Sequence, residues 1–198
     1  MKKGLLLVVS GPSGCGKGTI CNLLISNNES INVSVSLTTR KPRDGEVEGI
    51  NYFFVPEEKF KSMVDNNEVL EYAYVHGSYY ATPKNFVFDK LEKGEDILLE
   101  IDVQGAMQVK EIYPQATFIF LLPPSMEELK NRIIKRGTES TEAIELRLKN
   151  AHKELEYIRE YDYVVVNDQV EKAVNDIECI IQAEKCKTNR VINNTSIL

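Results

Sequence analysis

A glycine-rich segment near the start of the chain constrains its fold more than any other feature. Residues 5–19 read LLLVVSGPSGCGKGT, an apolar run that passes into a turn with glycines at positions 11, 14 and 16. A helical pattern through Ile20 and Leu24 follows. Strand, glycine-rich turn and helix in this order are typical of a phosphate-binding loop, in which backbone N–H groups and the helix N-terminus face an anion.

The residues of this loop form the expected phosphate site. Lys17 supplies a charge that can reach the β- and γ-phosphates. Gly18 follows it where Ser or Thr is usual, so a metal ion lacks that hydroxyl and either Thr19 or water completes its shell. The residues predicted to bind the nucleotide phosphates here are Gly11, Pro12, Ser13, Gly14, Cys15, Gly16, Lys17, Gly18 and Thr19.

Length and charge restrict the class of protein. The chain has 198 residues and a net charge of −6. This length fits one compact domain, and the negative charge disfavours broad binding of nucleic acid. No apolar run reaches transmembrane length, and the four cysteines show no CxxC or zinc spacing. We expect a cytoplasmic protein, monomeric or homodimeric, that binds no membrane.

The pattern of apolar runs predicts an α/β fold. Four runs, at residues 5–9, 97–101, 117–122 and 163–166, are typical of buried parallel strands, and helical patterns separate or follow them. Ser125 and Glu128 form a capping box for a helix over 125–135. Further helices are predicted over about 141–160 and 170–183, and the tail from 187 is expected to be poorly ordered.

Residues 34–84 differ from the rest in composition. They are rich in Tyr, Val, Phe and Gly, with alternation that predicts short antiparallel strands at 51–55 and 69–75. A helical stretch, 57–66, lies between those two segments. We interpret the region as an inserted β-rich lobe that faces the phosphate-binding loop.

Two arginines in this lobe predict a second phosphate site. Arg40 and Arg43 flank a proline, with hydroxyl side chains just upstream. Guanidinium groups bind phosphate in a bidentate manner. A solvated basic turn is the alternative, but the phosphate-binding loop elsewhere in the chain favours the phosphate site.

Three carboxylates are candidate ligands. Glu71 interrupts an apolar strand and can accept hydrogen bonds from N1–H and the exocyclic amine of a guanine. An outward-facing strand glutamate explains its pattern equally well. Glu100 and Asp102 end a buried strand, where an acid in phosphate-loop enzymes holds Mg²⁺ directly or through water.

Three more arginines surround a polar connection. Arg132, Arg136 and Arg147 flank residues 137–141. Arginines on a mobile segment can move onto transferred phosphates when a lid closes. Ordinary exposed helix arginines are the alternative, above all for Arg132.

Taken together, these motifs resemble the guanylate kinase family over about residues 4–185. The resemblance rests on SGPSGCGKGT, SLTTRKPRDGE with a later YFF, EIDVQG, LPPS and RGTE. It implies a P-loop NTPase-type parallel core, an inserted GMP-binding lobe and a helical lid. It also implies transfer of the γ-phosphoryl group from Mg²⁺-ATP to GMP, with use of dGMP as well, in purine metabolism.

The resemblance assigns roles by position. Arg132 and Asn167 match contacts near adenine, and Lys17, Arg43, Arg136 and Arg147 match catalytic residues. The matched GMP-binding residues are Ser36, Arg40, Arg43, Tyr52, Glu71, Tyr80, Thr82 and Asp102. Ala81 and Glu100 depart from the commonest residues, glycine and aspartate. The metal ligands expected are Thr19 and Glu100, directly or through water.

The same resemblance predicts the boundaries of the three parts of the enzyme. The core covers about 1–33, 85–124 and 160–185, the GMP-binding lobe about 34–84 and the lid about 125–159, before a flexible tail at 186–198. Two alternatives stay open: a kinase for another small phosphorylated acceptor, and a non-catalytic scaffold. Base-edge acceptors such as Glu71 favour guanine over a sugar phosphate, and the intact Lys17 favours an enzyme.

Overall fold

A five-stranded parallel sheet forms the centre of the molecule. The computed structural model describes residues 3–75, 77–135 and 141–194. Strand order is β2-β7-β1-β8-β9, and every pairing is parallel. The strands are β1 (Leu6–Ser10), β2 (Ile31–Val33), β7 (Asp96–Glu100), β8 (Thr117–Leu122) and β9 (Tyr163–Val166). The predicted parallel core is confirmed, and β1 at its centre delivers the phosphate-binding loop.

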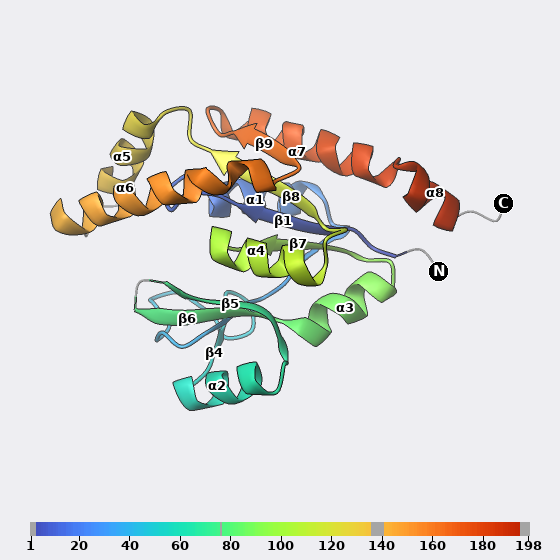
Figure 1. Ribbon diagram of the computed structural model, residues 1–198, viewed down its shortest axis with the longest axis horizontal. Helices are drawn as coiled ribbons and strands as arrows, with labels where there is room; N and C mark the ends of the chain where they lie inside the picture. Colours follow the sequence, from blue (N-terminus) through green and yellow to red (C-terminus); the bar gives the residue numbers. More distant parts are fainter. Residues whose placement is uncertain (1–2, 76, 136–140, 195–198) are drawn as a thin grey trace.

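Helices cover both faces of this sheet (Figure 1). One apolar cluster joins the sheet to α1 and α7, and a second joins it to α3 and α4. These helices are α1 (Lys17–Asn27), α3 (Lys84–Glu92), α4 (Val103–Ile112) and α7 (Val170–Lys185). Burial on both faces explains why the strands are apolar without alternation.

A second, smaller sheet lies beyond α4 (Figure 1). Its strand order is β4-β3-β6-β5, and its own core contains Leu37, Phe60, Val69 and Ala81. The elements are β3 (Leu37–Thr38), β4 (Phe53–Phe54), α2 (Glu57–Asp65), β5 (Val69–Val75) and β6 (Ser78–Pro83). Residues 69–75 form an antiparallel strand as predicted, since β5 pairs with β6 in that direction, whereas β4 pairs with β3 in parallel. The antiparallel prediction was wrong for β4, because the long loop between β3 and β4 brings the chain back so that β4 runs in the same direction as β3.

Helices α5 (Met126–Lys135) and α6 (Thr141–Leu155) form a separate pair at one end of the molecule, with α6 continuing into the 3₁₀ helix η1 (Glu156–Glu160) (Figure 1). Leu129, Ile133 and Ala151 form their shared core. The predicted cap is confirmed, because the Glu128 backbone N–H donates to Ser125 Oγ at 3.0 Å. The long helix predicted to residue 160 changes to 3₁₀ geometry at Glu156.

Several elements were given no range from the sequence: β2, β3, β6, α3, α4 and α8 (Thr188–Asn194). Strand β2 has three residues and depends on pairing with β7, so no local pattern identifies it. Helix α8 occupies part of the tail that was expected to be poorly ordered. The Arg190 guanidinium donates to the Gln115 carbonyl at 3.3 Å, a contact that supports this helix. In the described ranges, no helix is both long and apolar enough to cross a membrane.

Candidate nucleotide-binding site

The glycine-rich loop after β1 has backbone angles that favour glycine. Gly14 has φ +93° and Gly16 has φ +99°, a region that other residues rarely adopt. Gly16 is also the N-cap of α1. A Cβ at Gly16 would lie 2.3 Å from Nδ2 of Asn167, so a side chain is excluded on steric grounds as well. The predicted loop is therefore present, at the N-terminus of a helix.

Arg132 and Asn167 hold this loop from outside. Asn167 Nδ2 donates to the Cys15 carbonyl at 2.8 Å, and one nitrogen of Arg132 donates to the same oxygen at 3.4 Å. Arg132 also donates to the Asn167 carbonyl at 3.1 Å and to Glu128 at 2.9 Å. Arg132 is thus more than an exposed helix arginine. Burial raises the pKa of the Cys15 thiol, which makes this residue an inert part of the loop.

Lys17 lies where two cavities meet. Its Nζ donates to the carbonyls of Gly11 at 2.6 Å and Pro12 at 3.2 Å. The larger cavity, about 720 Å³, extends from the loop to α6, and the smaller, about 170 Å³, extends into the second sheet. The smaller one is lined by Lys17, Ser36, Tyr52, Glu71, Ala73, Val75, Tyr80, Glu100, Ile101 and Asp102. Lys17 lines both cavities, so it can reach ligands in each.

Glu71 is a buried acid in the smaller cavity. Glu71 is 4% exposed, and Thr82 Oγ1 donates a hydrogen bond to Glu71 Oε1 at 2.6 Å. Burial raises the pKa of Glu71 to about 7, and the nearby Asp102 charge adds to the rise. The outward-facing alternative is wrong, because a register irregularity between Val69 and Glu71 leaves Leu70 and Glu71 both buried.

Arg40 is already paired within the lobe. It makes two contacts of 2.6 Å with the Glu46 carboxylate, and its guanidinium lies 5.0 Å from the Tyr52 ring centre. It is also within hydrogen-bonding reach of Tyr80. The Arg40 guanidinium lowers the pKa of Glu46 to about 2. Glu46 was not predicted to be a site residue; its six-residue separation from Arg40 was the available signal.

Arg43 does not line either cavity. Its side chain is exposed, while its backbone N–H donates to Glu46 Oε2 at 2.8 Å. Arg40 lines neither cavity either, but it lies beside Tyr52 and Tyr80, both of which line the smaller one, whereas the Arg43 side chain stays exposed.

Glu100 lies against the residue that replaces the usual loop hydroxyl. A Cβ at Gly18 would lie 3.5 Å from Glu100 Oε1, so the carboxylate approaches the place that a serine side chain would occupy. Both residues line the larger cavity. Thr19 is exposed and lines neither cavity. The geometry favours Glu100 over Thr19 as the residue that faces a metal-bound phosphate group.

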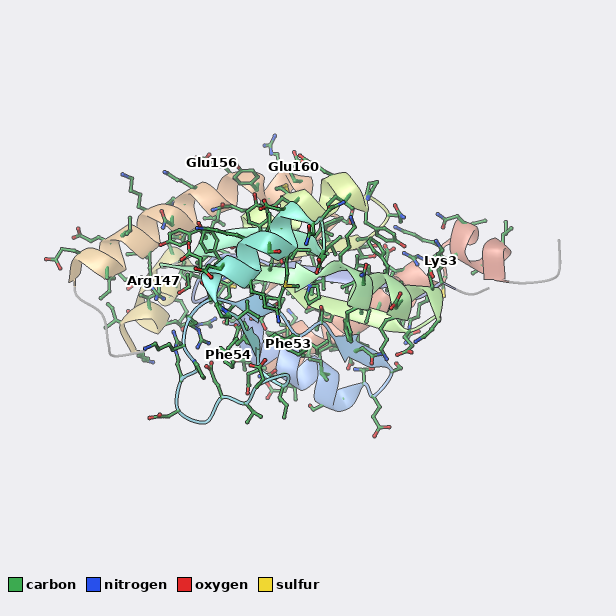
Figure 2. All side chains as sticks on the ribbon, turned by 90° about the horizontal axis from the view of Figure 1, so that it is seen from below. Lys3, Phe53, Phe54, Arg147, Glu156 and Glu160 are labelled. Atoms are coloured by element: carbon green, nitrogen blue, oxygen red, sulfur yellow. The ribbon has the colours of Figure 1, made fainter. Side chains whose placement is uncertain are left out.

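Helix α6 carries polar side chains into the larger cavity. Arg147, labelled in Figure 2, donates to Ser13 Oγ at 3.5 Å. Asn150 and Glu154 line the same cavity. Burial raises the pKa of Glu154. Glu154 was not predicted to be a site residue, although positions 147, 150 and 154 share one helix face. Arg136 lies outside the described residues.

Comparison with known proteins shows the family of the chain. The family model described as guanylate kinase matches residues 3–184. The chain belongs to the guanylate kinase family. It is similar to a guanylate kinase of Caldanaerobacter subterraneus, 58% identical over 96% of this chain and 92% of the relative. A guanylate kinase of Clostridioides difficile is 55% identical over 98% of this chain and 94% of the relative.

A solved structure supports the same family. The crystal structure of guanylate kinase from Anaplasma phagocytophilum has a TM-score of 0.80 and 39% identity, covering 96% of this chain and 90% of that one. Membership of the guanylate kinase family makes this chain an ATP:GMP phosphotransferase. A kinase for a different acceptor and a non-catalytic scaffold are both disfavoured by these relatives.

Proposed function

We propose that the smaller cavity holds GMP and the larger one holds the phosphates of ATP, with Lys17 between them. The observation that carries this assignment is the position of Lys17 at the junction of both cavities. A single ammonium there can neutralise charge on donor and acceptor phosphates together. The glycine-rich loop supports the donor side, because its backbone N–H groups and the N-terminus of α1 favour anions.

In this proposal, guanine is recognised by Glu71, Thr82 and Asp102. The guanine edge presents N1–H and an amino group, and carboxylates accept such donors strongly. Glu71 is buried and held by Thr82, which supports a fixed acceptor. Its carboxylate has to be ionised to accept from both donors, so its raised pKa links GMP binding to pH.

The GMP phosphate is bound by Ser36, Arg40, Arg43, Tyr52 and Tyr80. The Arg40–Glu46 pair has two short contacts, so Arg40 is already held in an orientation with Tyr52 and Tyr80 beside it. Fixing a guanidinium before the ligand arrives reduces the entropy lost on binding. Arg43 is exposed and has to move to reach the phosphate.

Mg²⁺ is the proposed cofactor, with Glu100 facing it directly or through water. The residues fit such an ion, because Gly18 leaves space beside the Glu100 carboxylate and Mg²⁺ prefers oxygen ligands with several waters retained. Bound Mg²⁺ would offset negative charge on the donor phosphates. The exposed position of Thr19 makes it the weaker of the two ligand candidates.

The remaining groups position and enclose the reactants. Arg147 already reaches the loop at Ser13, and a small movement of α6 would bring it onto the transferred phosphoryl group. Arg136 has the same proposed role. Lys17 and these arginines neutralise charge while a GMP phosphate oxygen attacks in line, and closure of the lid excludes water as a competing acceptor.

We also propose the finer context of the enzyme. Use of dGMP, a role in purine nucleotide metabolism and a cytoplasmic location fit the reaction, and all four cysteines are free. The boundaries given above for core, GMP-binding lobe, lid and tail are part of this proposal, with α8 now known to lie within the tail. The oligomeric state is proposed to be monomer or homodimer.

An acceptor panel tests the guanine assignment. A coupled assay of ADP formation with GMP, dGMP, IMP and AMP should give efficient turnover with GMP and dGMP. IMP lacks the amino group from which Glu71 and Asp102 accept hydrogen bonds, so its kcat/KM should be about 10- to 100-fold lower. AMP should be poorer still. Efficient phosphorylation of AMP would contradict the proposed guanine pocket.

Guanine binding should weaken as pH falls below about 7. The pKa of Glu71 is raised to about 7, so acidification protonates the acceptor that guanine requires. Guanosine is the preferred probe because a phosphate group itself titrates near pH 6. Its Kd, measured by calorimetry, should rise by roughly an order of magnitude between pH 7.5 and pH 5.5. Binding that is constant over this range would show that the ionised form of Glu71 is not required.

A further inference from the structure

Helix α4 approaches the Glu71 carboxylate at a glycine. Gly105 is a buried residue in the first turn of α4, and a Cβ there would lie 2.3 Å from Glu71 Oε2 and 3.0 Å from its Cδ. Real Cβ atoms essentially never lie this close to another atom. The position of the carboxylate therefore depends on the absence of a side chain at residue 105.

Helix α4 and strand β5 cannot easily move apart from each other. Asp102 caps α4 and accepts from the Gly105 backbone N–H at 2.8 Å. One turn further on, Gln108 forms two hydrogen bonds with the Tyr72 backbone, accepting at 3.1 Å and donating at 2.7 Å. Tyr72 is the residue after Glu71, so α4 and β5 are locked together beside the contact.

The Glu71 side chain is therefore the part that would yield. Its Oε1 is held by Thr82 at 2.6 Å, and only its terminal atoms lie within 3.0 Å of the missing Cβ. A methyl group at position 105 would displace the carboxylate and leave the backbone contacts in place. The φ angle of Gly105 is not in the positive region, so backbone strain does not account for this glycine. Alanine is in fact the better helix former.

We propose that Gly105 is a positioning residue for guanine recognition, which sets the Glu71 carboxylate against α4 at the depth that the base requires. It touches no substrate in this role and acts only through Glu71. The inference rests on the assignment of Glu71 to guanine made above. If Gly105 has this role, the selectivity for guanine depends on a residue of α4, a helix of the core, and not only on the lobe that holds GMP.

The first test is Gly105→Ala, assayed with GMP and with ATP separately. Displacing an acceptor by about 1 Å can cost up to about 100-fold, so the KM for GMP should rise at least about tenfold. The KM for ATP and the melting temperature should stay unchanged, and the preference for GMP over IMP should fall. Glu111→Ala, an exposed site on the same helix, is the matched control and should leave all of these values unchanged.

The second test is rescue by a shorter acid. In Gly105→Ala/Glu71→Asp the carboxylate is one methylene shorter, so it can fit beside the added methyl group. Each single variant should impair GMP use, and the double variant should lose less than the product of the two single losses. Independent losses, or an unchanged KM for GMP in Gly105→Ala, would overturn the role of Gly105. Equal losses for ATP and GMP with a lower melting temperature would overturn it too, by making the glycine a packing requirement.

Glu71→Gln, measured in parallel, separates the two proposals. If it leaves GMP use intact, the assignment of Glu71 to guanine fails, and the inference about Gly105 fails with it. If it lowers GMP use while Gly105→Ala does not, only the inference about Gly105 fails.

Discussion

Replacing Lys17 with alanine is expected to abolish nearly all phosphoryl transfer while the protein stays folded. Lys17 lines both cavities, where charge on donor and acceptor phosphates has to be neutralised in the transition state. Removing such a preorganised charge should lower kcat by about 10³-fold. A coupled assay of ADP formation with saturating GMP and ATP measures this loss.

Folding should change little in the same variant. Within the described residues, Lys17 donates hydrogen bonds to two loop carbonyls, of Gly11 and Pro12, and it belongs to neither of the apolar clusters that surround the sheet. The free energy of unfolding should fall by about 1 kcal/mol or less. Lys172→Ala, an exposed lysine on α7, controls for loss of a positive charge and should keep full activity. Near-normal turnover in Lys17→Ala would refute the assignment of the loop to ATP.

The second large effect is expected from Glu71→Gln. Glutamine keeps the shape of the side chain but replaces one acceptor oxygen with a donor, which faces a donor of guanine. Leaving buried donors unpaired costs about 1–3 kcal/mol each, so kcat/KM for GMP should fall by about 10²- to 10³-fold. The KM for ATP should hardly change. Initial rates with varied GMP, compared with Glu111→Gln on the exposed side of α4, measure the difference.

Stability distinguishes this result from misfolding. The pKa of Glu71 is about 7 in the folded protein against an ordinary value near 4.5, so its ionisation weakens folding as pH rises between these values. Glutamine cannot ionise, and Glu71→Gln should therefore be at least as stable as the parent at pH 8. A variant that loses GMP use together with stability at pH 8 would argue that Glu71 serves packing instead.

Local features of this protein were predictable because their physics lies within a few residues. The glycines of the phosphate-binding loop and the Ser125 cap with Glu128 depend on backbone geometry over one turn. The buried strands were visible because a sheet covered on both faces needs continuous apolar runs. The family resemblance added roles that spacing alone could not assign, such as that of Asn167.

Features that depend on pairing were not predictable. The direction of β4, the existence of β2 and the irregularity that turns Glu71 inward all depend on how a strand pairs with its neighbour in the sheet. The Arg40–Glu46 pair is close in sequence, but a turn of that length allows many side-chain arrangements. Helix α8 is short and depends in part on contact with Gln115.

The amino-acid sequence by itself determined the phosphate-binding loop, the parallel α/β core and the family, because each depends on short patterns that tolerate no other local conformation. The tertiary structure alone decided which acid is buried, where Lys17 meets both cavities and why residue 105 carries no side chain. Those properties depend on the distance between elements far apart in the chain. A backbone distance of that kind is set by packing of the whole domain.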